Sequence, residues 1–206
     1  KMPIILLIRH GENDYVKEQR HPGRKSGIHL NKKGRSQAKA IAEKLKSAPI
    51  MAVYSSPLER TMETAKPIAK ALDLAVIPRH GLIETDVGDW QGKKIKKLKR
   101  LKAWPKVQLN PSRFRFPGGE RIEDTQHRFV EEIEFLVEKH DPGDMLVCVS
   151  HADPIKLVVA YYIGLPLDMY RRLHVSPASI TGLNIGEFGS QLLVMNYDLS
   201  LNFAKH

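Results

Sequence analysis

The chain has 206 residues, of which 42% are hydrophobic and 27% are charged, and its formal net charge is +10. This length favours one domain with a substantial core, and this composition excludes an intrinsically disordered chain. The excess of Lys and Arg favours an anionic partner, which leaves phosphate compounds, nucleic acid and a membrane surface open. No apolar run approaches the length that spans a bilayer, so we expect no membrane among its partners.

The cysteine content and the N-terminal pattern bear on the compartment. The single cysteine, Cys148, lies in an apolar stretch and permits no internal disulfide. Arg9 and His10 interrupt the N-terminal apolar run too early for a secretory signal. We therefore expect a cytoplasmic protein. The oligomeric state is open, with a homodimer as one option.

The first apolar run, from Ile4 to Ile8, ends abruptly in Arg9, His10 and Gly11. An unbroken apolar run of this length predicts a strand that is buried on both faces, and open α/β sheets bind ligands beyond the carboxyl ends of such strands. Arg9 has a planar fork that fits phosphate, and His10 is a base or nucleophile that works near neutral pH. Taken alone, this stretch is more simply explained by a strand end that lies in solvent.

Strand and helix patterns alternate along most of the chain. After a cation-rich loop at 12–30, the apolar spacing predicts helix 31–47, strand 50–54, helix 58–72, strand 74–77, helix 120–139, strand 145–150, helix 154–163, and strands 179–185 and 191–197 around a turn at 187–189. Asn31 is predicted to cap the first helix, and Ser56, followed by Pro57, to cap the second. The alternation predicts a three-layer α/β/α sandwich with a mostly parallel central sheet.

Reactive or cationic residues follow several of the predicted strands. Arg9 and His10 end the first strand, Arg60 lies in the helix turn after the second, His151 ends the fourth, and Glu84 lies in a loop. Because the carboxyl ends of parallel strands share one edge, these side chains can converge. Two arginines and two histidines suit a phosphoryl group, and a nearby carboxyl can protonate a leaving oxygen. We see no acidic cluster or metal-spaced set of ligands and expect neither a metal nor another cofactor.

Five stretches in this order resemble the histidine phosphatase superfamily, also called the phosphoglycerate mutase-like family. They are 6–12, 55–65, 83–92, 117–120 and 149–151. Five correctly ordered blocks are specific, although any one of them alone would be weak. The resemblance covers nearly the full length and implies a phosphoglycerate mutase-like fold, with residues 1–206 as a single histidine phosphatase domain.

The resemblance also implies roles for the five residues at the strand ends. His10 would be the catalytic nucleophile, which forms a phosphohistidine. Arg9, Arg60 and His151 would bind the phosphoryl oxygens. Glu84 would protonate the departing oxygen and then activate water. The chemistry agrees, because a covalent intermediate on an imidazole is ordinary nucleophilic catalysis.

Some residues depart from the family pattern. Asn13 stands where Ser or Thr is usual, Val16 where Asn is common, and Asp153 where a small glycine is common. Asn13 can still donate an amide hydrogen bond to a phosphate oxygen. Asp153 is a candidate for selecting substrate or tuning His151, and it can equally be a residue that starts a helix. Arg20 falls where the family often has a cation that contacts substrate.

The stretch 93–115 holds ten Lys or Arg residues. Trp104 and Phe114 are interleaved with them, and Phe116 follows directly. Part of the stretch, 95–104, is predicted to be helical. We interpret 93–117 first as a lid-like insertion over the site, next as a plain solvated surface, and last as a nucleic-acid surface. The aromatic residues fit internal packing better than base stacking.

The segment after Gly92 also bears on the reaction. It is compact, whereas the mutases for which the family is named resemble one another in a longer insertion at this place. This chain is more similar to the short broad-specificity phosphatases. We therefore expect hydrolysis of a small phosphorylated metabolite, with inorganic phosphate as a product and without a metal. Phosphoglycerate mutase activity is the alternative, and a non-catalytic or nucleic-acid-binding role is less favoured because all five reactive residues are present.

Overall fold

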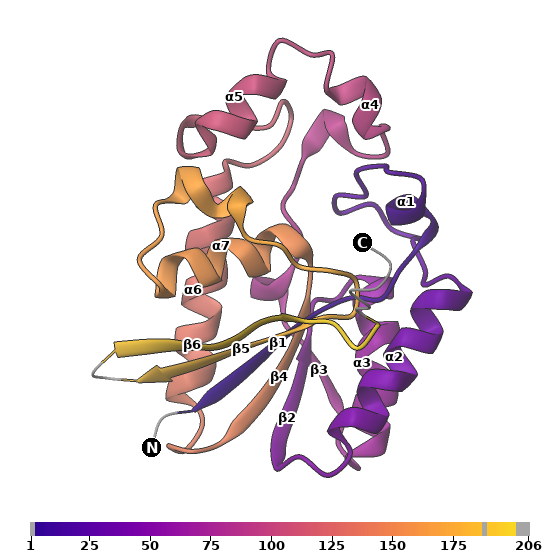
Figure 1. Ribbon diagram of the computed structural model, residues 1–206, viewed down its shortest axis with the longest axis vertical. Helices are drawn as coiled ribbons and strands as arrows, with labels where there is room; N and C mark the ends of the chain where they lie inside the picture. The colour runs from indigo at the N-terminus through magenta and orange to yellow at the C-terminus, as the bar shows by residue number, and fades with distance from the viewer. Residues whose placement is uncertain (1–2, 187–188, 201–206) are drawn as a thin grey trace.

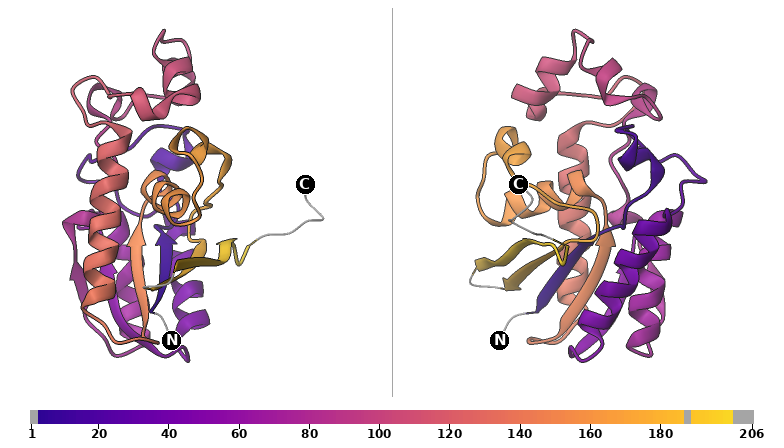
Figure 2. Two further views of the ribbon diagram at one scale, coloured as in Figure 1. Left: turned by 90° about the vertical axis from the view of Figure 1, so that its left-hand side faces the viewer. Right: turned by 45° about the vertical axis from the view of Figure 1, so that its right-hand side comes forward.

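The computed structural model describes residues 3–186 and 189–200 and contains one central sheet with helices on both faces (Figures 1 and 2). Its strands are β1 (Ile4–Arg9), β2 (Ile50–Ser55), β3 (Val76–Pro78), β4 (Met145–Ser150), β5 (Ile180–Gly186) and β6 (Gly189–Tyr197). Its helices are α1 (Asp14–Lys17), α2 (Lys32–Leu45), α3 (Glu59–Ala71), α4 (Ile95–Leu98), α5 (Trp104–Leu109), α6 (Ile122–Glu138) and α7 (Ala152–Tyr162). This architecture confirms the predicted three-layer α/β/α sandwich.

The strand order in the sheet is β3-β2-β4-β1-β5-β6. The pairs β3-β2, β2-β4 and β4-β1 are parallel, whereas β5 is antiparallel to both β1 and β6. Within the described strands, therefore, only β5 runs against the rest, and the mostly parallel sheet is confirmed. The carboxyl ends of β1, β2 and β4 consequently meet at one edge.

The apolar run of β1 is continuous because both of its faces are buried. Leu7 belongs to the core cluster that contains Phe129 of α6, and its neighbour Ile8 to the cluster that contains Ile41 of α2 and Ile68 of α3. Successive strand residues point to opposite faces, so α6 and α7 cover one side of the sheet, and α2 and α3 cover the other. Figure 2 shows these two helical layers from the side.

The predicted cap of the second helix is wrong. Helix α3 begins at Glu59, and its N-cap residue, Leu58, makes no side-chain capping bond. Ser56 Oγ instead lies 2.9 Å from Nε2 of His151, and the Ser56 carbonyl accepts a hydrogen bond from Thr61 Oγ1. A serine that suits an N-cap by type is used here for a contact across the sheet edge.

The predicted helix 95–104 is confirmed only at its two ends, because α4 ends at Leu98 and α5 begins at Trp104. Pro105 lies in the first turn of α5, where its lack of an N–H costs nothing, and this favours a new helix start. The predicted turn at 187–189 falls on residues 187 and 188, which lie outside the described residues. Within the described ranges, no helix combines the length and apolarity needed to cross a membrane.

The loop after β1 is joined to the start of the Lys- and Arg-rich segment 93–115 by backbone hydrogen bonds. His21 N donates to Lys93 O at 2.9 Å, and Gly92 N donates to His21 O at 2.7 Å. Ile95 N donates to Gln19 O at 2.8 Å. The start of the basic segment is therefore fixed against the loop that follows β1.

A side chain at position 11 would collide with the backbone of α2, so this position requires glycine. A Cβ added at Gly11 would lie 2.6 Å from the carbonyl oxygen of Gly34 in α2, and one added at Gly34 would collide with Glu12 O. The two glycines let the chain after His10 pass directly against α2. The backbone that Gly11 approaches is thus that of a neighbouring helix.

Candidate active site

His10 is held in position where the parallel strands β1 and β4 end. Its backbone N–H donates to Ser150 O at 3.0 Å, which extends the pairing of β1 with β4 by one residue. Its side-chain Nδ1 lies 2.7 Å from the carbonyl oxygen of Gly11. A carbonyl can only accept, so Nδ1 carries the proton and Nε2 keeps a lone pair. The fold therefore selects the tautomer in which Nε2 is nucleophilic.

The pKa of His10 is held well below its usual value by burial, and in addition by the charges of Arg60 and Arg9. A buried imidazole beside two guanidinium groups loses solvation and gains repulsion when it binds a proton. His10 is thus neutral at physiological pH.

Arg60 lies fully buried in the first turn of α3, as expected from the sequence. Its Nη2 donates to Gly23 O at 2.8 Å and to Nδ1 of His151 at 3.3 Å. Among the described residues, none accepts a hydrogen bond from its Nε or Nη1. Buried N–H donors almost always find acceptors, and a guanidinium fork matches the oxygens of a phosphoryl group. These two donors are therefore suited to bind the oxygens of an anion.

His151 stands directly after β4 at the start of α7 and is fully buried. Because its Nδ1 accepts from Arg60, its proton is on Nε2, which donates to Ser56 Oγ. Burial first, and then Arg60 and His10, keep the pKa of His151 well below its usual value. The two imidazole rings meet edge to face with their centroids 5.3 Å apart. The site thus contains two neutral histidines next to each other.

Glu84 supplies a buried carboxyl group at the same place. Its Oε1 accepts from the N–H of Thr85 at 2.9 Å, and its Oε2 lies 3.7 Å from Nδ1 of His151. Burial and the nearby charge of Asp153 raise the pKa of Glu84 to about 7, against the opposing effect of Arg60. A carboxyl group with this pKa can both donate and accept a proton near neutral pH.

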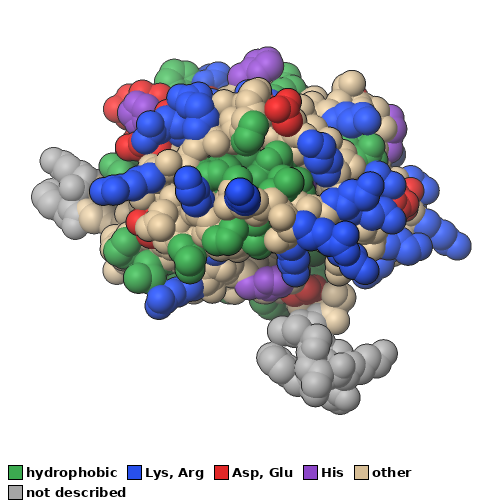
Figure 3. All heavy atoms as spheres, turned by 90° about the horizontal axis from the view of Figure 1, so that it is seen from above, with side chains coloured by type: hydrophobic (Ala, Val, Ile, Leu, Met, Phe, Trp, Pro, Cys, Tyr) green, Lys and Arg blue, Asp and Glu red, His purple; other side chains and the backbone are tan. Residues whose placement is uncertain are grey.

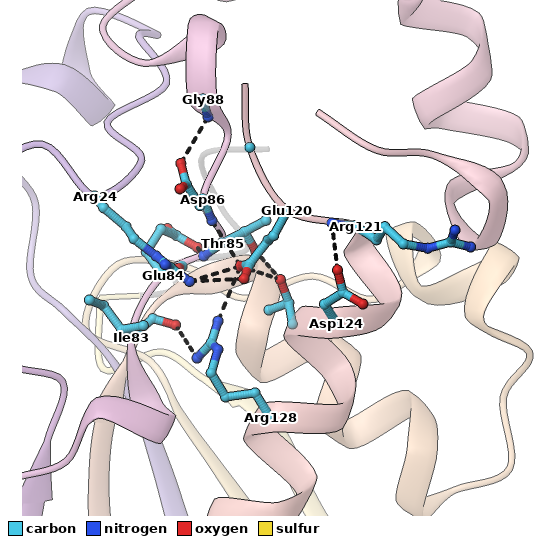
Figure 4. A network of polar contacts seen from close by, with 12 residues as sticks. Arg24, Ile83, Glu84, Thr85, Asp86, Gly88, Glu120, Arg121, Asp124 and Arg128 are labelled. Atoms are coloured by element: carbon cyan, nitrogen blue, oxygen red, sulfur yellow. Dashed lines mark hydrogen bonds and ion pairs between the residues drawn. The ribbon is translucent and has the colours of Figure 1, made fainter. Parts of the chain in front are cut away.

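An ion-pair network holds the loop that carries Glu84 (Figure 4). Arg24 donates from Nε to the Glu84 carbonyl at 2.8 Å, and its Nη2 lies 3.0 Å from both carboxylate oxygens of Glu120. Arg128 donates to the same carboxylate at 3.2 Å and to the carbonyl of Ile83 at 3.0 Å. The carboxylate of Glu120 therefore positions both arginines, and these hold the backbone carbonyls of Ile83 and Glu84.

From the sequence we assigned no role to Arg24, Glu120 or Arg128. Glu120 belongs to one of the blocks that carry the family resemblance, and this was the available signal. Arg24 lies in a loop and Arg128 within a long helix, where nothing local distinguishes them from ordinary surface cations.

Arg9 and Asn13 are the two further candidates for binding phosphate, and each has a buried donor atom. Arg9 is partly buried, and its Nη1 donates to Val175 O at 2.7 Å. Asn13 is fully buried, and its Oδ1 caps α1 by accepting from the N–H of Val16 at 2.9 Å. Neither Arg9 Nε nor Asn13 Nδ2 has an acceptor among the described residues. Both atoms are therefore buried donors of the type that an oxyanion would engage.

A cavity of about 360 Å³ opens over these groups. Arg9, His10 and Glu84 line it, together with Arg20, His21, Ile95, Lys99 and Asp153. Both candidate substrate-selecting residues, Arg20 and Asp153, thus face the same space as the predicted nucleophile.

The two candidate selecting residues are held in place differently. Arg20 pairs with Glu18 at 2.8 Å on the protein surface. Asp153 contacts Lys156 Nζ at 2.6 Å. Burial alone would raise the pKa of Asp153, but Lys156 and Arg171 hold it below the usual range, so its carboxylate is ionised. In the described part of the chain, no group of three or more His, Cys, Asp or Glu side chains is arranged to hold a metal ion.

Comparison with known proteins identifies the family. The profile of the histidine phosphatase superfamily (branch 1) matches residues 5–198. The chain belongs to this superfamily, as its motifs predicted.

Similar proteins include both phosphatases and mutases. Phosphoserine phosphatase 1 of Hydrogenobacter thermophilus is 30% identical over 200 residues, which are 95% of this chain and 92% of that protein. "Probable phosphoglycerate mutase GpmB" of Salmonella choleraesuis is 30% identical over 89% of this chain and 85% of its own. The structure of phosphoserine phosphatase from Entamoeba histolytica in complex with 3-phosphoglyceric acid superposes with a TM-score of 0.87 at 26% identity, over 96% and 98% of the two chains.

The network around Glu120 makes a prediction about stability. Glu120→Gln leaves Arg24 and Arg128 partly buried without their carboxylate, so we expect the free energy of unfolding to fall by about 1–3 kcal/mol. Urea denaturation measures this change. The matched control is Glu123→Gln on α6, whose exposed ion pair with Arg121 should contribute less than about 0.5 kcal/mol. Equal stability of the two variants would contradict a structural role for the network.

Proposed function

We propose that the protein hydrolyses phosphomonoesters of small anionic metabolites through a phosphohistidine on His10. The observation that carries this proposal is the unprotonated Nε2 of His10 in a buried site where two N–H donors of Arg60 have no acceptor among the described residues. Membership of the superfamily and the phosphatase names of its relatives support the same reaction.

In the first step, Nε2 of His10 attacks phosphorus and the bond from phosphorus to the ester oxygen breaks. Arg9, Arg60 and the amide of Asn13 donate to the phosphoryl oxygens and stabilise the charge that they carry in the transition state. Protonated Glu84 gives its proton to the departing oxygen, so the alcohol leaves neutral.

In the second step, Glu84 is a carboxylate and takes a proton from a water molecule. That water attacks phosphorus, the bond to Nε2 breaks, and phosphate leaves. The lone pair returns to His10 and the proton remains on Glu84, which restores the starting state. A pKa near 7 suits a group that must be an acid in one step and a base in the next.

His151 contributes through Arg60 in this arrangement. Its Nδ1 accepts from Nη2 of Arg60 and orients the guanidinium plane. A phosphoryl dianion at the site favours protonation of Nδ1, which would then give up the bond from Arg60 and donate to a phosphoryl oxygen instead.

The outer part of the cavity supports a substrate with a second anionic group. Arg20 and Lys99 line the cavity and are more exposed than Arg60, and a carboxylate is the simplest group that they would bind. Phosphoserine and phosphoglycerate have this chemistry, and relatives carry these names. We infer that the segment 93–117 acts as a lid, because Ile95 and Lys99 line the cavity. Phosphoglycerate mutase activity is the second candidate, favoured by the mutase-named relative.

The proposed nucleophile is tested by substitution. His10→Ala should lower the release of phosphate from an aryl phosphate by at least about 1,000-fold, because no covalent intermediate can form. His80→Ala, at an exposed histidine, is the control and should keep full activity. Circular dichroism should show that both variants fold. Turnover by folded His10→Ala near the rate of the wild type would rule out the mechanism.

The raised pKa of Glu84 predicts the pH dependence of the first step. For an alkyl phosphate, whose leaving group needs a proton, kcat/KM should fall above pH 7 as Glu84 loses its proton. Glu84→Gln should lower kcat/KM by about 100- to 10,000-fold and remove this alkaline limb. With 4-nitrophenyl phosphate, which leaves readily as an anion, the loss should be smaller. An unchanged alkaline limb in the variant would assign the ionisation to another group.

The substrate class is tested by comparing phosphoserine and 3-phosphoglycerate with phenyl phosphate, which has no second anionic group. Lys99→Gln should raise KM about three- to tenfold for the two carboxylates and leave KM for phenyl phosphate unchanged. Lys39→Gln, far from the cavity, is the charge-matched control. An equal effect on all three substrates would contradict the carboxylate contact. Formation of 2-phosphoglycerate faster than release of phosphate would favour the mutase reaction instead.

A further inference from the structure

The net charge of the protein is located in one segment. Residues 93–115 contain ten of the 33 Lys and Arg residues, and no Asp or Glu lies between Asp89 and Glu120. Taking these ten from the 33 leaves 23, which equals the number of Asp and Glu residues in the whole chain. The formal charge of +10 is therefore the charge of this segment, and the rest of the protein is balanced.

All ten of these cations are exposed. Of these ten cations, only Arg115 forms an ion pair within the described residues, with Asp124 at 3.6 Å. Eight of the ten lie within 93–106, over α4 and α5 at one end of the molecule (Figure 1). Figure 3 looks onto that end and shows Lys and Arg side chains gathered around a patch of hydrophobic ones. We call residues 93–109 the basic tip.

The basic tip also exposes apolar side chains. Leu101 is 40% exposed and Leu109 is 70% exposed, although a leucine normally favours the interior. Leu98 and Val107 are buried in the core cluster beneath, so the tip is anchored on the body of the protein. The exposed leucines therefore stand on a fixed support, interspersed with unpaired cations.

The aromatic residues of this region pack against Trp90, with Phe114 and Phe116 buried and Trp104 half-buried. Trp104 stacks on Trp90 with ring centroids 6.0 Å apart, and Phe114 and Phe116 lie 5.7 and 5.3 Å from the same ring. Proteins that bind single-stranded nucleic acid without sequence preference stack bases on exposed aromatic rings, and the tip exposes aliphatic leucines in their place. Cations with aliphatic side chains among them fit the headgroups and outer acyl region of an anionic bilayer.

We propose that the basic tip docks the protein on membrane surfaces that contain anionic lipids. The lysines approach the lipid phosphates, and Leu101 and Leu109 enter the interface. From the sequence we expected no membrane partner, because no run of residues can span a bilayer; docking at the surface needs no such run. Helix α4 belongs to the tip and also gives Ile95 to the cavity, so docking brings the cavity next to the lipid surface.

The test measures co-sedimentation of the protein with vesicles of phosphatidylcholine alone and of phosphatidylcholine with phosphatidylglycerol. We expect at least about tenfold tighter binding to the anionic vesicles, weakened by added salt. The triple variant Lys96→Glu, Lys97→Glu, Lys102→Glu should lose at least about tenfold in affinity. The control is Lys39→Glu, Lys66→Glu, Lys70→Glu, which makes the same change of net charge at exposed positions on α2 and α3 and should bind clearly better than the tip variant.

A second variant, Leu101→Ser with Leu109→Ser, leaves the charge unchanged and should weaken vesicle binding several-fold. Circular dichroism and the thermal unfolding midpoint of every variant should match those of the wild type, which shows that they fold. No preference for anionic vesicles, or an equal loss in the tip variant and its charge control, would overturn the proposal. Binding of a single-stranded oligonucleotide at lower protein concentration than vesicles, with no effect of the leucine variant, would assign the tip to nucleic acid instead.

Discussion

The buried guanidinium of Arg60 determines the protonation states and hydrogen bonds of the residues around it. Burying a permanent cation is expensive unless its N–H groups find acceptors, and within the described residues Gly23 O and His151 Nδ1 are the acceptors that it has. Its charge helps to keep His10 and His151 neutral, and its bond to His151 sets the tautomer of that ring. The remaining N–H donors leave a place that an oxyanion completes.

The protonation of Glu84, the proposed acid, depends on a second balance of charges. Burial and Asp153 favour protonated Glu84, whereas Arg60 favours the carboxylate. Burial and Asp153 outweigh the arginine, and the pKa of Glu84 rises to about 7. This balance needs a fixed distance between Glu84 and its neighbours, and the carboxylate of Glu120 fixes it by holding the adjacent backbone through Arg24 and Arg128.

The sequence predicts the fold class and the convergence of the reactive side chains, because both depend on strand ends that are visible as apolar runs followed by Arg, His or Ser. It does not predict the partner of Ser56, since an N-cap and a contact with a distant histidine use the same residue type. Nor does it reveal the network of Glu120. Its members are Arg24 in a loop, Glu120 just before α6 and Arg128 within α6. Contacts of this kind depend on tertiary packing and leave no local pattern.

The central claim is that Nε2 of His10 carries a phosphoryl group during turnover. The most direct measurement is rapid quenching of the enzyme with a substrate labelled with ³²P, followed by mapping of the labelled peptide. The account predicts an acid-labile, alkali-stable label on the peptide that contains His10, bonded through Nε2 and formed at least as fast as turnover. A label on another residue, or turnover without any labelled protein under conditions in which the first step is the faster one, would contradict it.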